Sequence, residues 1–442
     1  MPIETVSGTS LKYYLLSFDA AGKEREESGG RMSQKVLEAL ASEPITDVFI
    51  MSHGWMGDVP AARDQYTRWI GAMAKQSADL EKIAQARPGF YPLMIGVHWP
   101  SKAWGDENLE SGLVSFDVND ADPIDSAVDE YAERIANTET ARQALQTILT
   151  AAMEGSPSDS LPPDVLNAYQ VLNQEADLKS EGESAAPGSD WDGFDPEAIY
   201  QASEQEPVSF STDSSSTWDA VLNPLRVLSF WKMKDRARKI GESGGFNLLK
   251  QLQENTPETV RFHLMGHSFG CILVSSTLAG AKGEGKLVRP VNSVTLVQGA
   301  MSLWSYCAKI PYERDRPGYF NSILEQHKVT GPIVTTYSDF DYAVGKMYPL
   351  AAGIVLSSVD FAPGHLPKYG GIGSYGICGY DLTAEYLDML DSNTSYEFKP
   401  GKIYNIDSRK FINDVTDKSI GAHNDFAKPE VAHVVWSAVS VS

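Results

Sequence analysis

The chain has 442 residues, with 37 Lys and Arg against 59 Asp and Glu, which gives a formal net charge of −22. This charge disfavours binding to a nucleic-acid backbone, because that function requires a basic surface. Hydrophobic residues make up 42 % and charged residues 22 % of the chain, as in soluble globular proteins and unlike disordered or fibrous ones. We therefore expect most of the chain to fold around a sizeable core.

Short apolar runs alternate with helical patterns along most of the chain. Runs rich in β-branched and aromatic residues are typical of strands. The predicted strands are Leu11–Phe18, Thr46–Met51, Pro92–His98, Val260–Met265, Val291–Val297, Pro332–Tyr337 and Lys402–Ile406. The clearest helical patterns are Arg63–Ala86, Val227–Leu252 and Ser268–Ala279. Because parallel strands are joined by helices, this alternation predicts an α/β fold in which helices cover both faces of a mainly parallel sheet.

An acidic segment interrupts this alternation between residues 101 and 220. It holds 26 acidic and four basic residues, so its net charge of −22 equals that of the whole chain and the remainder is neutral. Helical spacing of apolar residues over Asp129–Ala152 indicates that part of the segment is helical. Other parts are rich in Ser, Gly and Pro, which favours mobility. These parts are Gly155–Asp164, Glu181–Asp195 and Ser209–Thr217.

The acidic segment divides the chain into three parts. Residues 1–100 and 221–442 form the two parts of the predicted α/β core, and residues 101–220 form an insertion between them. Like charges within the insertion repel one another unless a basic surface compensates them. The basic stretch Arg226–Lys239 offers such a surface for docking, and the alternative is an ordinary solvated helix face.

The sequence gives no sign of export, membrane insertion or cofactor binding. Its N-terminus lacks basic and apolar signal regions, and no run approaches the roughly 18 apolar residues of a membrane span, so we expect a cytoplasmic protein. Cys271, Cys307 and Cys378 form no CxxC pair, which predicts isolated buried thiols. Without a metal-ligand cluster, a P-loop or a dinucleotide fingerprint, we expect neither a metal nor another cofactor. The oligomeric state cannot be predicted from these patterns.

The strongest chemical motif is Gly266–Gly270, with the sequence GHSFG. It directly follows the predicted strand Val260–Met265 and precedes the helical run Cys271–Ala279. A serine in such a tight turn between strand and helix is held in a strained conformation, and the flanking glycines let neighbouring backbone approach it. The helix N-terminus also favours negative charge that develops nearby. This context favours Ser268 as a nucleophile over an ordinary Gly-Ser turn.

With this motif the chain resembles the α/β-hydrolase superfamily, in which the nucleophile, the acid and the histidine follow one another along the chain. The resemblance implies an acid on the loop beyond a late strand, which corresponds here to the loop after Pro332–Tyr337. Two carboxylates compete in that loop. We favour Asp341 over Asp339, because a Val-Gly pair follows Asp341 as in the family pattern. Asp360 is a more distant third candidate.

The resemblance also implies a histidine in a loop between the last strand and the C-terminal helix. His423 fits this place, because it follows Lys402–Ile406 and precedes the helical pattern Pro429–Val439. His433 lies inside that helix, where a packed or solvated histidine is expected. His365 lies in a loop without a recognisable motif. We therefore expect His423 to be the catalytic base.

An acyl-transfer site also needs hydrogen-bond donors for the oxyanion. His53–Trp55 follow the predicted strand Thr46–Met51 and occupy the place of the family's oxyanion loop, so the resemblance implies the backbone amides of Trp55 and Phe269 as donors. We expect His53 to orient this loop as a buried side chain and not to act as a second base. The residues expected around the substrate are His53, Gly54, His267 and Trp99, although an aromatic residue at the Trp99 position is more often core packing.

Together these positions imply a serine hydrolase that cleaves a carboxylic ester of a small-molecule or acyl substrate through an acyl-enzyme on Ser268. A lipase or phospholipase and a serine peptidase or amidase would use the same triad, and a non-catalytic binding protein could share the fold. Because the insertion enters at the sheet edge that carries Ser268, we expect it to form a lid or cap over the site. A surface excursion without such a role is the alternative.

Overall fold

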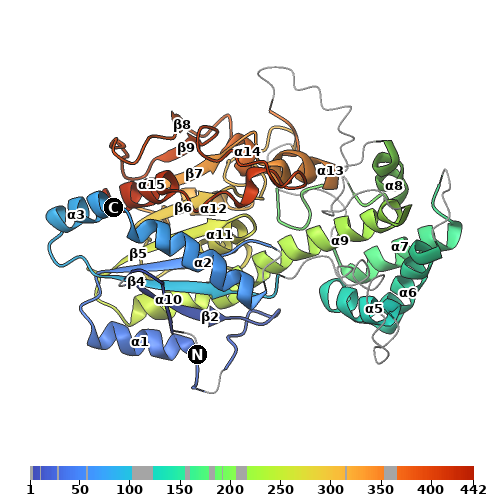
Figure 1. Cartoon of the computed structure of the whole chain (residues 1–442), viewed down its shortest axis with the longest axis horizontal. Helices are drawn as coiled ribbons and strands as arrows, with labels where there is room; N and C mark the ends of the chain where they lie inside the picture. The colour runs from blue at the N-terminus through green and yellow to red at the C-terminus, as the bar shows by residue number, and fades with distance from the viewer. Residues whose placement is uncertain are drawn as a thin grey trace.

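A nine-stranded, mostly parallel sheet forms the centre of the molecule (Figure 1). The computed structural model describes residues 3–9, 11–26, 29–55, 58–101, 123–154, 160–178, 185–191, 193–205, 217–313, 316–352 and 366–442. Within these residues the strand order is β1-β2-β4-β3-β5-β6-β7-β9-β8, and β1 and β2 are the one antiparallel pair. The strands are β1 (Ile3–Thr5), β2 (Lys12–Ser17), β3 (Asp47–Ser52), β4 (Pro92–His98), β5 (Arg261–His267), β6 (Ser293–Val297), β7 (Ile333–Tyr337), β8 (Ala384–Asp388) and β9 (Ile403–Asp407). The fold is therefore of the α/β class, as the sequence predicts.

All seven predicted strands are present, with ends that differ from the prediction by at most two residues. The sequence analysis missed the two edge strands, β1 and β8. Strand β1 has only three residues, and the side chains of β8 are largely exposed. Neither strand has the apolar run by which a buried strand is recognised.

Helices cover both faces of the sheet. Along β2, Tyr13 and Leu15 join one hydrophobic cluster, whereas Tyr14 and Leu16 join another, because successive strand residues point to opposite faces. Helices α2 (Val59–Ala74), α3 (Ser77–Ala86) and α15 (Pro429–Ser440) cover the first face, and α1 (Met32–Ser42), α9 (Thr217–Ile240), α10 (Phe246–Glu254) and α11 (Gly270–Ala279) the second. Three short helices are α12 (Asn321–Glu325), α13 (Tyr348–Ala351) and α14 (Ile372–Tyr375). Among the described residues, no helix has the combined length and apolar character needed to cross a membrane.

Two of the predicted helices are interrupted. The run Arg63–Ala86 forms α2 and α3, because the backbone of Gln76 leaves the helical region with a ψ of 67°. The run Val227–Leu252 forms α9 and α10, which are joined by the π-helical turn Gly241–Gly245. A Cβ atom at Gly241 would collide with the carbonyl oxygen of Leu273 in α11. This turn therefore lets the backbone at the end of α9 approach α11 closely.

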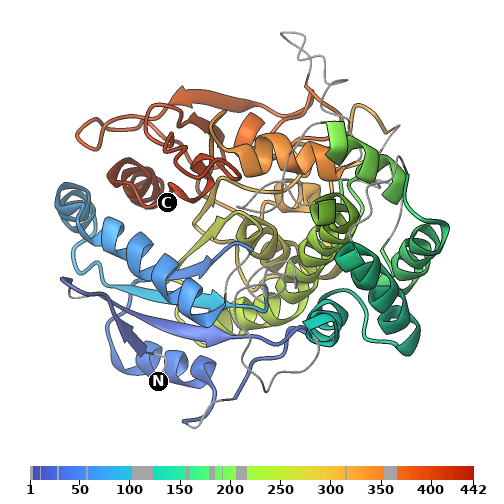
Figure 2. The same ribbon diagram turned by 45° about the vertical axis from the view of Figure 1, so that its right-hand side comes forward.

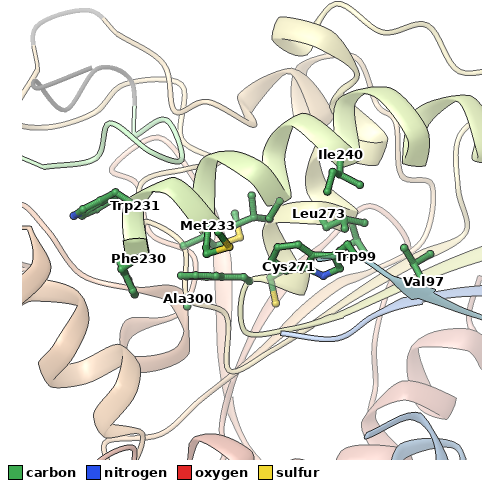
Figure 3. Close-up of a cluster of buried hydrophobic side chains, with 14 of the residues drawn as sticks. Val97, Trp99, Phe230, Trp231, Met233, Ile240, Cys271, Leu273 and Ala300 are labelled. Carbon is green, nitrogen blue, oxygen red and sulfur yellow. The ribbon is translucent and has the colours of Figure 1, made fainter. Parts of the chain in front are cut away.

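Helix α9 packs against α11 on the second face of the sheet (Figure 3). Met233 and Ile240 of α9 and Cys271 and Leu273 of α11 are fully buried in one cluster. Trp99, which directly follows β4, is fully buried in the same cluster. Helix α9 is thus part of the core that supports the end of β4.

The acidic insertion forms helices α5 (Pro123–Arg134), α6 (Glu139–Glu154), α7 (Pro163–Ala176) and α8 (Pro196–Gln205). They are grouped beside α9 at one end of the molecule (Figures 1 and 2). Helix α9 begins at Thr217 and crosses the boundary expected at residue 220. Tyr131, Leu145 and Tyr169 of the insertion are fully buried in the cluster that also contains α11, so insertion and core share one apolar interior. Parts of the three segments rich in Ser, Gly and Pro lie outside the described residues.

The basic stretch Arg226–Lys239 lies on α9 and contacts the insertion through backbone carbonyls. Lys232 Nζ donates a hydrogen bond to the carbonyl oxygen of Ala176 at 2.5 Å. Arg236 Nη2 donates to the carbonyl oxygens of Glu133 at 2.9 Å and Arg134 at 3.1 Å. These carbonyls end helices α7 and α5, where the helix dipole places partial negative charge. The two cations therefore bind helix ends of the insertion.

An ion pair lies at the ends of the parallel strands where they begin. Asp47, the first residue of β3, accepts hydrogen bonds from Arg87 Nη1 at 2.8 Å and His263 Nε2 at 3.0 Å, both at Oδ1. Burial opposes the charge of Asp47, but the hydrogen bond and charge of His263 and the charge of Arg87 hold the pKa of the carboxyl below its ordinary value. The charged carboxylate thus links two neighbouring strands to the segment that precedes β4.

We expect Asp47→Ala to lower the free energy of unfolding by about 3 kcal/mol, because it removes the charged partner of the partly buried Arg87 guanidinium and a hydrogen-bond partner of the buried His263. Urea unfolding followed by circular dichroism measures this loss. Glu43→Ala is the matched control, because it breaks an exposed pair with Lys12 and should cost less than about 1 kcal/mol. Equal losses in the two variants would contradict the expectation.

Candidate active site

Ser268 lies in the sharp turn between β5 and α11. Its φ of +56° falls in the left-handed region, where residues other than glycine are strained. A Cβ atom at Gly266 would lie 2.6 Å from the backbone nitrogen of Cys271, and one at Gly270 would lie 2.6 Å from the carbonyl oxygen of His53. Both glycines of the motif are therefore required by close backbone contacts on either side of Ser268.

The structure brings Ser268, His423 and Asp341 into one hydrogen-bonded chain. His423 Nε2 lies 2.8 Å from Ser268 Oγ, and His423 Nδ1 lies 2.9 Å from Asp341 Oδ2 and 3.0 Å from Oδ1. Asp341 follows β7 and His423 follows β9, so both side chains reach Ser268 from the same edge of the sheet. In this arrangement Nδ1 donates its proton to the carboxylate, and Nε2 is left to accept the proton of the serine hydroxyl.

The surroundings of Asp341 and Asp339 differ sharply. Asp341 is fully buried, and in addition to His423 it accepts hydrogen bonds from Gln298 Nε2 at 2.9 Å and from the backbone nitrogen of Val344 at 3.0 Å. The side chain of Asp339 is 65 % exposed and pairs with Arg409 at 3.0 Å. The geometry therefore favours Asp341 as the partner of His423. Asp360, the third candidate, lies outside the described residues, as does His365.

The sequence analysis did not identify Gln298, which directly follows β6. Its φ is +47°, and its side-chain carbonyl accepts a hydrogen bond from Thr336 Oγ1 at 2.9 Å. The backbone nitrogen of Gln298 donates to the same hydroxyl at 3.1 Å. These bonds orient the amide so that its nitrogen donates to Asp341. The available signal was its position, because a polar residue directly after a buried parallel strand lies at the sheet edge where ligands bind.

His267 is hydrogen-bonded to the backbone of His423. Its Nε2 donates a hydrogen bond to the carbonyl oxygen of His423 at 2.9 Å, and its ring packs against that of Phe426 at 4.4 Å. Nδ1 is buried and has no hydrogen-bond partner. Burial, followed by the charge of His423, lowers the pKa of His267 well below its usual value. We therefore assign His267 as a neutral ring that holds the backbone of His423 in place.

The loop expected to hold the oxyanion lies against Ser268. His53–Trp55 directly follow β3, and a Cβ atom at Gly54 would lie 2.6 Å from Ser268 Cβ. Only a glycine at this position permits such a close approach. The rings of Trp55 and Phe269 stack at 5.5 Å with an interplanar angle of 21°. The loop and Phe269 thus form one continuous wall beside Ser268.

A cavity of about 390 Å³ opens at Ser268 and His423. Its lining includes an aromatic wall in which Phe230 of α9 packs edge-on against Phe269 at 5.1 Å and Trp55 at 5.7 Å. Other lining residues are His53, Ala61, Ala62, Asp64, Gln65, Arg68, His267, Ala300, Ala343, Met347, Asp417, Ser419, Ile420, Asn424 and Phe426. Apolar groups therefore dominate the space next to the serine.

The four residues that we expected around the substrate take different positions. His53 and His267 line the cavity, whereas Gly54 lies against Ser268 without being part of the lining. Trp99 is not a lining residue. It is fully buried, and its ring nitrogen donates a hydrogen bond to the carbonyl oxygen of His53 at 3.2 Å, so it supports the loop from behind. The core interpretation of this aromatic residue is the correct one.

Cys271, Cys307 and Cys378 are buried free thiols, as expected. In the part of the chain that the structure describes, no three His, Cys, Asp or Glu side chains are grouped so as to hold a metal ion. Comparison of the chain with protein-family models, with curated proteins and with solved structures yields no match.

Proposed function

We propose that the protein is a serine hydrolase of the α/β-hydrolase type that cleaves carboxylic esters. The main support is the hydrogen-bonded chain of Ser268, His423 and Asp341, in which Ser268 and His423 line the cavity. The order of the three residues along the chain and the loop after β3 agree with that superfamily. The strained backbone of Ser268 is also what a nucleophile elbow requires.

In the proposed reaction the Oγ atom of Ser268 attacks the acyl carbon while His423 Nε2 takes the hydroxyl proton. The carbonyl oxygen becomes an oxyanion that accepts hydrogen bonds from the backbone amides of Trp55 and Phe269. When the intermediate collapses, His423 returns the proton to the departing alkoxide and the acyl group stays on Ser268. Water then attacks the acyl-enzyme by the same steps. Asp341 holds the Nδ1–H tautomer of His423 and stabilises its cation.

Labelling with a fluorophosphonate probe tests this proposal. The probe should modify Ser268 of the native protein, and peptide mass spectrometry identifies the modified residue. Ser268→Ala should abolish labelling, whereas Ser276→Ala, which removes a buried hydroxyl without a hydrogen-bond partner, should leave it unchanged. A folded protein that neither reacts with the probe nor hydrolyses soluble esters would instead be a binding protein. Faster cleavage of emulsified lipid or of peptides than of soluble esters would favour a lipase or a peptidase.

Phe230 is expected to limit the length of the acyl group, because its ring closes the aromatic wall next to Ser268. We expect Phe230→Ala to raise the ratio of kcat/KM for p-nitrophenyl octanoate to that for the acetate by about tenfold, since a single methylene in an apolar pocket is worth about 10- to 200-fold. Phe230→Leu keeps most of the bulk and should give a smaller change. An unchanged ratio in both variants would place the acyl group elsewhere.

A further inference from the structure

The two ring nitrogens of His53 face partners of opposite kind. Nδ1 lies 2.8 Å from the carbonyl oxygen of Gly54, which can only accept a hydrogen bond. The backbone nitrogen of Trp99, which can only donate, lies 3.4 Å from Nε2. The proton of His53 is therefore on Nδ1, and Nε2 is the acceptor.

His98 is the second partner of Nε2. Its Nδ1 lies 3.1 Å from Nε2 of His53, and because Nε2 accepts, His98 must donate. The parallel register of β3 and β4 pairs Ser52 with Val97, so the next residues of the two strands, His53 and His98, lie side by side. Both side chains are buried, with exposed fractions of 1 % and 8 %. The sheet itself thus holds the donor against its acceptor.

Both histidines are neutral over the usual working range of pH. Burial, followed by the charge of His98, lowers the pKa of His53 to about 3 against the opposing hydrogen bond to Gly54. Burial also lowers the pKa of His98 to about 4, helped by Arg25 and Arg63 and opposed by Asp58. A neutral His98 carries one ring proton, and the geometry assigns it to Nδ1, where it is donated to Nε2 of His53.

The hydrogen bond from His53 to Gly54 determines the direction of the next amide. In a trans peptide the carbonyl of Gly54 and the N–H of Trp55 point in opposite directions. Holding the carbonyl on the His53 side therefore directs the Trp55 amide away from His53. The same peptide begins at the glycine whose Cβ position lies 2.6 Å from Ser268 Cβ.

We infer that His98 is a positioning residue for the oxyanion loop, because its hydrogen bond fixes the tautomer in which His53 holds the peptide between Gly54 and Trp55. His98 does not touch the reacting atoms. It acts through His53. Its loss leaves the longer, 3.4 Å contact from the Trp99 backbone nitrogen to hold Nε2, so the His53 ring is held less firmly and can turn or change tautomer. The amide of Trp55 then loses its fixed direction. This role rests on the proposed function, in which that amide is an oxyanion donor.

The kinetic test compares His98→Leu with His433→Leu, which removes a buried imidazole on α15 that is hydrogen-bonded to Asp79. We expect His98→Leu to lower kcat about 100-fold with little change in KM, because loss of one oxyanion donor costs about 10²- to 10³-fold. Affinity for a boronic-acid transition-state analogue should fall by a similar factor. His433→Leu should change stability but not kcat. His98→Asn, whose amide nitrogen can replace Nδ1 as donor, should recover most of the lost rate.

A direct test is independent of catalysis. Long-range ¹H–¹⁵N spectra of the histidine rings at pH 7 should show His53 of the native protein protonated at Nδ1 only, and His98→Asn should preserve this state. Protonation at Nε2 would overturn the inference whatever the activity. Unchanged kcat and analogue affinity in folded His98→Leu would also overturn it. If the native protein shows neither ester hydrolysis nor fluorophosphonate labelling, the proposed function fails, while the spectra still decide the tautomer.

Discussion

Ser268→Ala is expected to lower kcat for a soluble ester by about 10⁶-fold, as removal of the nucleophile does in serine hydrolases. The substitution removes the only atom that can form the acyl bond in the proposed reaction, and His423 then has no hydroxyl to deprotonate. Initial rates with p-nitrophenyl butyrate, measured at high enzyme concentration, cover this range. The alanine keeps the Cβ atom, so the turn between β5 and α11 should persist.

Ser276→Ala on the same helix is the matched control and should retain the native rate. Its hydroxyl is buried without a hydrogen-bond partner, so its loss should cost little stability. If Ser268→Ala retained substantial activity after purification from a host without background esterase, another residue would be the nucleophile. Loss of activity in both variants would indicate disturbed packing of α11 instead of lost chemistry.

Asp341→Asn should lower kcat by about 10⁴-fold while the fold persists, because an amide in this place favours the wrong tautomer of His423. Asp341 is fully buried and contacts His423 through both oxygens, so no other described carboxylate is placed to substitute for it. Steady-state kinetics with the same soluble ester measure the loss. Thermal unfolding checks that the variant is folded.

Asp339→Asn provides the control two residues away. Its side chain is exposed and pairs with Arg409, and such surface pairs contribute little, so the rate should be native. The reverse result, with Asp339→Asn inactive and Asp341→Asn active, would show that the acid is misassigned although the fold is unchanged.

Much of the fold is predictable because buried parallel strands carry their own signal. The apolar run Pro92–His98 and the strand before Ser268 are read directly from residue type. Strand β8 is different. Its side chains are largely exposed, so its extended conformation depends on its hydrogen bonds to β9 and not on an apolar pattern. The turn Gly241–Gly245 also depends on a close contact with α11, which no local pattern contains.

The residues of the candidate site also differ in whether a local pattern predicts them. Ser268 sits in a continuous motif, so its turn can be predicted from neighbouring residues alone. Gln298 and His98 act through partners that are distant in sequence, Asp341 and His53, and only the sheet brings each pair together. For Trp99 the sequence left two interpretations open, because an apolar ring at a strand end can face either a ligand or the core.

The position of helix α9 determines where a chimera between this chain and another protein can be joined. Its first half packs among the helices of the insertion, its residue Phe230 lines the cavity, and its end fits against α11 at Gly241, where a Cβ atom would collide with the carbonyl oxygen of Leu273. In a chimera that receives a foreign insertion joined at residue 220, most of α9 would still come from this chain, and its side chains would fit the native insertion and not the foreign one. Transplantation should therefore succeed only with α9 and its glycine turn included, and the donor's acyl preference should travel with them.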